Sequence, residues 1–242
     1  MLAKFQTALQ MLYPPRCLSC GGLVESDFGL CGACWGDTPF IGGTICDACG
    51  VPLPGPSGGE VLSCDDCMRR PRPWSKGRSA LLYQGRARKM VLALKHGDRA
   101  EIARPAAKWL AQAASDIRAR DTLIAPVPLH WSRLVKRRYN QSALLAQALA
   151  AEIDMALCPD LLLRGRRTVS LDGKTQAQRF DVLQGAIQAN PKRRHRMSGR
   201  SVLLVDDVMT SGATLAASAE ACLAGGAREV CVLTLARVAK EA

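Results

Sequence analysis

Four Cys-x-x-Cys pairs in the first 67 residues constrain this chain more than any other feature of its sequence. Residues 1–15 hold one lysine and no long apolar stretch of the kind found in a signal peptide, so we expect a cytoplasmic location. In that compartment, repeated Cys-x-x-Cys pairs indicate metal binding rather than disulfides. A single pair would also fit a redox motif, but four pairs outside a βαβ context disfavour that interpretation.

Eight thiolates are the ligands of two tetrahedral Zn²⁺ ions, both structural because no coordination position stays open for a substrate. We favour consecutive pairing, and interleaved pairing, as in cross-braced fingers, is the alternative. Consecutive pairing predicts one site made of Cys17, Cys20, Cys31 and Cys34 and a second made of Cys46, Cys49, Cys64 and Cys67. The surrounding segment has few large apolar residues, so metal binding is expected to supply its folding free energy.

The sequence divides into three regions. Residues 1–16 have the apolar spacing of a short amphipathic helix, residues 17–70 are rich in Cys, Gly and Pro, and residues 77–242 alternate between helix and strand patterns. Prolines and Trp74 between the last two regions indicate a linker. No apolar run reaches the roughly 18–20 residues that span a bilayer.

The third region predicts an α/β domain with a mostly parallel sheet, because strand patterns alternate with helix patterns. The expected strands are 122–127, 201–205 and 229–236, and the expected helices are 86–95, 104–119, 141–152 and 214–224. Asn140 is a predicted N-cap, and Cys158, Cys222 and Cys231 are expected to be buried as small apolar side chains.

Positive charge is concentrated after residue 75. The chain has a net charge of +12; residues 1–75 contribute −2 and the remainder +14. Such a surface attracts phosphate groups of a small ligand or of a nucleic acid, although a solvated surface that aids solubility is the simpler alternative.

The stretch Val202–Thr214, VLLVDDVMTSGAT, predicts a site for a ribose 5-phosphate. An apolar strand ends at Asp206 and Asp207, and a loop rich in small and hydroxyl residues leads into a helix. Ligands of open α/β sheets bind beyond the carboxyl ends of the strands, and backbone N–H groups at a helix start bind phosphate. Two adjacent carboxylates suit the vicinal hydroxyls of a ribose, or a Mg²⁺ ion held with them.

This stretch resembles the signature of type I phosphoribosyltransferases, which bind phosphoribosyl pyrophosphate (PRPP). The resemblance implies that Asp206 and Asp207 contact the ribose hydroxyls. It also implies that the 5-phosphate is held by Thr210, Ser211, Gly212, Ala213 and Thr214.

The whole chain resembles the ComF family of competence-associated proteins, also described as GntX-like. The resemblance is carried by Tyr13-Pro14-Pro15-x-Cys17, the cysteine pairs, Leu94-Lys95, Pro126-Val127-Pro128-Leu129, Arg138-Tyr139-Asn140-Gln141 and the PRPP loop. It implies a double zinc ribbon over 17–70 followed by a type I phosphoribosyltransferase fold over 77–242, a mostly parallel sheet flanked by helices.

Further site residues follow from that resemblance. The loop 127–141 would handle pyrophosphate, usually with Mg²⁺, through Arg137 and Arg138, with Arg133 and Lys136 nearby, and Lys95 is a further candidate. Residues 164–187 correspond to a mobile loop of the family. This chain has Thr168 and Arg179 there, but Leu171 and Val182 stand where Gln and Asn are usual.

Three functions are compatible with these features. The chain could transfer phosphoribosyl to an acceptor, with Asp206, Asp207, Arg137 and Arg138 as catalytic residues. It could instead bind PRPP as a sensor without turnover. It could also be an adapter for single-stranded DNA or DNA-uptake proteins, with Lys192–Arg196 as the basic patch. We favour a PRPP-dependent transferase linked to competence or DNA processing.

Overall fold

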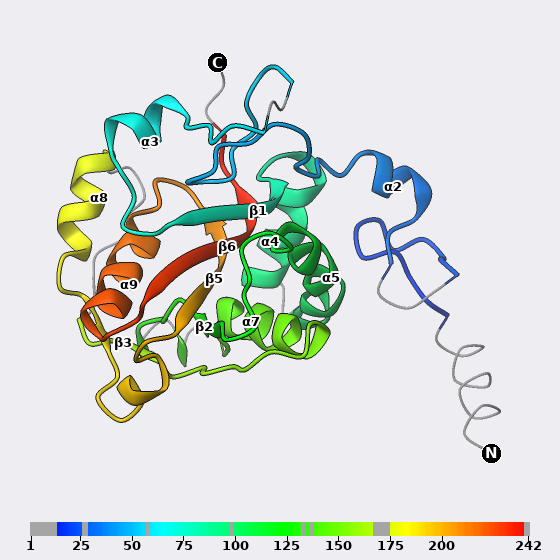
Figure 1. Cartoon of the computed structure of the whole chain (residues 1–242). Coiled ribbons are helices and arrows are strands. Elements are labelled where there is room, and N and C mark those ends of the chain that lie inside the picture. Colours follow the sequence, from blue (N-terminus) through cyan, green and yellow to red (C-terminus); the bar gives the residue numbers. More distant parts are fainter. Residues whose placement is uncertain are drawn as a thin grey trace.

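The computed structural model describes residues 14–25, 29–56, 59–96, 99–131, 134–135, 138–166 and 175–239, with the backbone alone at 176 and 177. The predicted N-terminal helix 1–16 therefore lies almost entirely outside the described residues. Figure 1 shows an α/β core with the cysteine-rich segment along one side.

A four-stranded sheet forms the centre of the fold. Its order is β1(Lys76–Leu82), β6(Glu229–Arg237), β5(Ser201–Met209) and β2(Leu123–Pro126), and all three pairings are parallel. The predicted α/β class is confirmed. Two strands of this sheet differ from expectation: β1, which was not predicted, lies just after the predicted linker, and β5 continues through Asp206 and Asp207, because β6 pairs with it as far as Met209.

Helices cover both faces of this sheet (Figure 1). One face packs against α4(Gly85–His96), α5(Ala103–Ala113) and α7(Gln141–Glu152), and the other against α9(Ala213–Ala224). Helix α8(Gln176–Leu183) and the hairpin β3(Leu162–Arg164)–β4(Ile187–Ala189) pack in turn against α9. Short 3₁₀ turns occupy Ala100–Ile102 and Arg194–Arg196. Successive side chains of β5 point to opposite faces of the sheet. Leu203 and Val205 therefore belong to the hydrophobic cluster on one face, and Val202 and Leu204 belong to the cluster on the other.

The predicted helices form where their apolar residues meet this sheet. Asn140 caps α7 as expected, accepting a hydrogen bond from the Ser142 backbone N–H (3.1 Å). Helix α5 ends at Ala113, six residues before its predicted end, and residues 114–117 continue as turns with Ala114 and Ile117 buried. Cys158, Cys222 and Cys231 are buried, as predicted.

The cysteine-rich segment packs along the open edge of β1. Backbone hydrogen bonds join Ile41 N–H to the Ala80 carbonyl, Leu82 N–H to Pro39 and Gly77 N–H to Asp47, all at 2.9 Å. A Cβ on Gly77 would lie 2.5 Å from the Ala48 carbonyl oxygen, so only glycine permits this approach.

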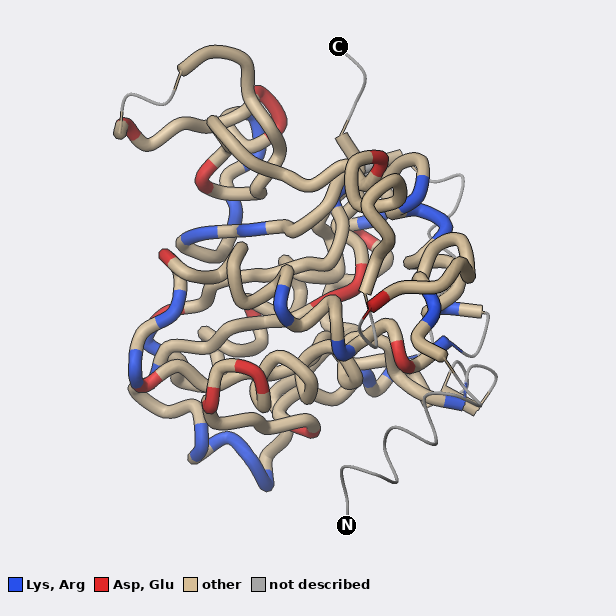
Figure 2. The backbone as a smooth tube through the Cα atoms, turned by 90° about the vertical axis from the view of Figure 1, so that its right-hand side faces the viewer, with Lys and Arg blue, Asp and Glu red and all other residues tan. Residues whose placement is uncertain are grey.

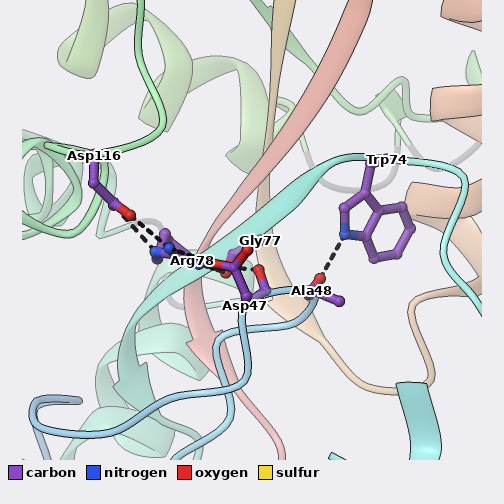
Figure 3. Close-up of polar contacts among 6 residues, drawn as sticks. All are labelled: Asp47, Ala48, Trp74, Gly77, Arg78 and Asp116. Carbon is purple, nitrogen blue, oxygen red and sulfur yellow. Dashed lines mark hydrogen bonds and ion pairs between the residues drawn. The ribbon is translucent and has the colours of Figure 1, made fainter. Parts of the chain in front are cut away.

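Side chains reinforce the same contact (Figure 3). The Arg78 guanidinium, on β1, forms ion pairs with Asp47 (2.7 Å) and with Asp116 beyond α5 (2.5 Å). The indole N–H of Trp74 donates to the Ala48 carbonyl (2.6 Å), and Trp74 is buried. The stretch predicted as a linker is thus packed between the cysteine-rich segment and the sheet.

Candidate functional site

The candidate phosphate loop joins β5 to α9. Gly212 is the N-cap of α9 with φ +80°, a left-handed conformation that favours glycine. A small hollow lined by Asp206 and residues 208–215 lies at this helix start, where the first-turn N–H groups have no acceptor within the helix. One of them, the Ala213 N–H, donates to Ser211 Oγ (3.4 Å). The local geometry is that of an anion site at a helix start.

The two aspartates lie beside this loop and have different partners. The pairing of β2 with β5 stops at Val205, so the next two residues project beyond β2. Asp206 Oδ1 accepts hydrogen bonds from Ser142 Oγ (2.7 Å) and from the Asp207 backbone N–H (2.9 Å). Asp207 Oδ1 lies 3.1 Å from Lys95 Nζ. The structure therefore brings together three predicted site residues: both aspartates and Lys95.

Burial, together with the neighbouring charge of Asp207, raises the pKa of Asp206 to about 7, although the hydrogen bond from Ser142 opposes the shift. Near neutral pH, this carboxyl group is partly protonated. The ionised form can accept a hydrogen bond from a hydroxyl group of a bound sugar, and the protonated form can donate one to it.

Residues 139–142 link the elements that carry these side chains. Tyr139 Oη donates to the Leu94 carbonyl (2.8 Å) and Gln141 Nε2 to the Lys95 carbonyl (3.4 Å), which ties the end of α4 to the start of α7. Asn140 Nδ2 donates to the Val127 carbonyl (3.1 Å) at the end of β2. This motif thus places Lys95 and Ser142 over the aspartates. Sequence reasoning missed Ser142, whose signal was its position two residues after a capping Asn.

Other predicted residues have varied positions. Arg179, on α8, donates to Thr210 Oγ1 (3.3 Å), so the candidate mobile segment contacts the phosphate loop. Arg138 is exposed and has φ +66°. The remaining basic residues of its loop and two residues of the mobile segment lie outside the described residues: Arg133, Lys136, Arg137, Thr168 and Leu171.

The eight paired cysteines form two clusters, each from consecutive pairs. The first ribbon site contains Cys17, Cys20, Cys31 and Cys34, the second contains Cys46, Cys49, Cys64 and Cys67, and within each the sulfur atoms lie within 4.8 Å of one another. This is the consecutive arrangement, not the interleaved one.

The sulfur positions fit zinc. A tetrahedron with Zn–S bonds of about 2.3 Å has S–S edges of about 3.8 Å. The Cys20–Cys31 and Cys49–Cys64 sulfur pairs are 3.8 and 3.7 Å apart. The ribbons also repeat one contact, since the third cysteine's backbone N–H donates to the first cysteine's Sγ at 3.4 and 3.3 Å. Both sites are therefore built as closed, structural Cys₄ centres.

Comparisons with known proteins identify both parts of the chain. Residues 8–68 match a model described as double zinc ribbon domain, and residues 139–242 match one described as phosphoribosyl transferase domain. DNA utilization protein YhgH of Salmonella typhimurium is 33% identical over 221 residues, which cover 89% of this chain and 93% of that protein. Competence protein F of Haemophilus influenzae is 28% identical over 228 residues, covering 92% and 96%. The chain belongs to the ComF family.

The predicted fold class is confirmed for this ComF-family chain: a phosphoribosyltransferase domain with an N-terminal double zinc ribbon. Among solved structures it is similar to the Bacillus subtilis glutamine PRPP amidotransferase complexed with ADP and GMP. That likeness has 19% identity and a TM-score of 0.41, and it covers 60% of this chain and 30% of that one. Across the described residues, no helix has the length and apolar character required to cross a membrane.

The basic patch 192–196 of this ComF-family chain lies far from the phosphate loop. It precedes β5 whereas the loop follows that strand, so nine strand residues, about 27 Å, separate them. Residues 192–194 form a continuous blue stretch at the lower left of Figure 2. Arg193 Nε hydrogen-bonds Asp160 (2.9 Å), and Arg194 donates to the Ala224 and Gly225 carbonyls at the end of α9. Part of the patch is thus committed to structural contacts.

Proposed function

We propose that the chain binds PRPP, with Asp206 and Asp207 on the ribose hydroxyls and the loop 210–214 on the 5-phosphate. The observation that carries the proposal is the placement of both carboxyl groups beside a helix-start anion loop, with the Lys95 ammonium 3.1 Å from Asp207. A sugar phosphate needs both kinds of group within a few ångströms of each other.

The favoured reaction is transfer of phosphoribosyl to an unidentified acceptor. The ribosyl centre then develops positive charge while pyrophosphate leaves, and the protein's contribution is positioning and electrostatic stabilisation. Lys95, Arg138 and Arg137 would stabilise the departing diphosphate. Mg²⁺, which the diphosphate would carry near Asp207, would neutralise part of its charge.

Binding and turnover are separated by two measurements. Calorimetry with PRPP and Mg²⁺ is expected to give saturable binding that the Asp206→Asn/Asp207→Asn double variant loses. Pyrophosphate release is then followed with a panel of nucleobases and amines. Binding without release across the panel would favour a PRPP sensor, and absence of binding by the unaltered chain would refute the proposal.

A second candidate is an adapter for single-stranded DNA in the cytoplasm, favoured by the exposed basic patch and by the name of the YhgH relatives. The patch lies at the opposite end of β5 from the loop, so both ligands could bind together. Affinity for an oligonucleotide should fall steeply with salt because counterions are released. Replacing Lys192 and Arg196 by Gln should reduce that slope, whereas an unchanged slope would exclude the patch.

A further inference from the structure

The second ribbon site contacts the phosphate loop through two arginines. Arg72 Nε donates to Cys67 Sγ (3.4 Å), and Nη1 of the same guanidinium donates to the Ser211 carbonyl (2.8 Å). Arg237 Nη2 donates to Cys49 Sγ (3.8 Å), and its Nη1 donates to the Thr210 carbonyl (2.7 Å) and the Met209 carbonyl (3.2 Å). Each planar guanidinium thus spans from a cysteine ligand to the loop backbone.

These contacts are built into the fold. Arg237 ends β6 and is 4% exposed, so its direction is fixed by packing. Arg72 lies over the Trp74 ring, with 5.6 Å from Cζ to the ring centroid. Gly212 makes room for both groups, since a Cβ there would lie 3.0 Å from Arg72 Nη1 and 3.2 Å from Trp74.

The charges are also matched. A Zn²⁺ ion with four thiolates carries a net charge of −2, and the two arginines supply +2. An arginine fork has fixed geometry, so anchoring one edge on a sulfur orients the other edge toward its carbonyl acceptor. Such charge-assisted hydrogen bonds are stronger than neutral ones.

The first ribbon has no equivalent link among the described residues. Two arginines contact this ribbon: Arg86 hydrogen-bonds Ser19 Oγ (3.4 Å) and Asp37 (2.8 Å), and Arg16 donates to the Gly21 carbonyl (3.0 Å). None of these partners belongs to the phosphate loop. The two ribbons therefore form similar metal sites but differ in their connection to the loop, which makes the first ribbon an internal control.

We infer that the second ribbon's zinc site is a positioning element for PRPP binding: through Arg72 and Arg237 it fixes the carbonyls of residues 209–211 and so the direction of the loop N–H groups. The inference rests on the proposed function. Without the ion, the second ribbon's sulfurs lose the bonds that fix their positions, and the arginines lose their anchors. The loop then samples conformations whose N–H groups no longer converge.

The matched substitutions are Cys64→Ser in the second ribbon and Cys31→Ser in the first, because the two cysteines are equivalent in sequence and contacts. Zinc content is measured for each. Deuterium exchange of the amides of residues 210–214 is measured without ligand, and PRPP affinity by calorimetry. Cys64→Ser should speed loop exchange and weaken PRPP binding at least about tenfold, whereas Cys31→Ser should change neither by more than about twofold.

An arginine variant keeps the inference testable if a cysteine variant fails to fold. Arg72→Gln should retain both zinc ions and still weaken PRPP binding about tenfold, equivalent to about 1.4 kcal/mol. Arg69→Gln is the control, because Arg69 is exposed and its ion pair among the described residues is with Asp66 in the same helix, α3(Asp65–Arg69). Arg72→Lys should restore part of the affinity, since one ammonium can replace one of the two contacts.

The outcomes separate this inference from the proposed function. If the unaltered chain binds PRPP but Arg72→Gln binds it equally well with unchanged loop exchange, the inference is overturned and the proposed function stands. If the unaltered chain does not bind PRPP, the proposed function fails. Loop exchange then still decides whether the second ribbon orders residues 210–214.

Discussion

Replacing Asp206 by Asn should stabilise the protein while it impairs PRPP binding. Asn has nearly the same shape, and its Oδ1 can still accept the hydrogen bonds that Ser142 Oγ and the Asp207 N–H now donate. The substitution removes a carboxylate that the fold desolvates and places beside a second carboxylate. The free energy of unfolding of the variant should therefore exceed that of the unaltered chain.

The pKa of Asp206 sets the magnitude. It rises from 3.8 to about 7 in the folded protein, and each unit corresponds to about 1.36 kcal/mol. Folding therefore favours the protonated form, so the cost of ionising Asp206 grows as pH rises from about 4 to about 7 and is constant above. Relative to the unaltered chain, the variant should gain about 2 kcal/mol at about pH 5 and about 4 kcal/mol at about pH 8.

Thermal unfolding at several pH values measures the gain, which should reach about 10 °C in Tm at about pH 8 for a chain of this length. Asp207→Asn is the control: it relieves the same repulsion but removes the ion pair with Lys95, so the gain should be small. A gain independent of pH, or a loss of stability at about pH 8, would refute the reasoning. PRPP affinity should fall for both variants.

Three further effects are expected. Gly212→Ala should destabilise by about 1–2 kcal/mol in chemical denaturation because φ is +80° and the cradle is tight, whereas Gly36→Ala, with open space around it, should be nearly neutral. Arg78→Met should cost about 2 kcal/mol in the same assay, since it leaves Asp47 and Asp116 without their shared partner; equal stability would exclude that role. Removing zinc with a chelator should lower Tm and expose both ribbons to protease, and unchanged cleavage would show that the ribbons fold without metal.

The sequence predicted local features well where a short pattern of residues is typical of a single structural role. The Cys-x-x-Cys spacing predicted two four-sulfur sites, and the strand followed by two acids and a small-residue loop predicted the arrangement around Asp206. Helix α7 was predicted with its observed bounds because Asn140 is a strong cap and the apolar residues after it meet the sheet.

Long-range contacts were the part that sequence reasoning could not supply. Strand β1 was overlooked because its residues Lys76, Gly77 and Arg78 read as polar, yet each has a partner from the cysteine-rich segment or from β6. Ser142 and Arg72 gave no motif, because their roles depend on segments 64 and 139 residues away along the chain. A linker was predicted at Trp74 because prolines surround it, and only the folded chain reveals the pocket that buries it.

The backbone contacts between residues 39–47 and β1 bear on solubility. A sheet whose outermost strand shows free N–H and C=O groups invites pairing with other molecules. Here the cysteine-rich segment covers the outer edge of β1 and forms three backbone hydrogen bonds with it. Loss of zinc would do more than unfold two small ribbons: it would uncover a template for intermolecular β-pairing, and metal starvation in a cell would then deplete the protein by aggregation.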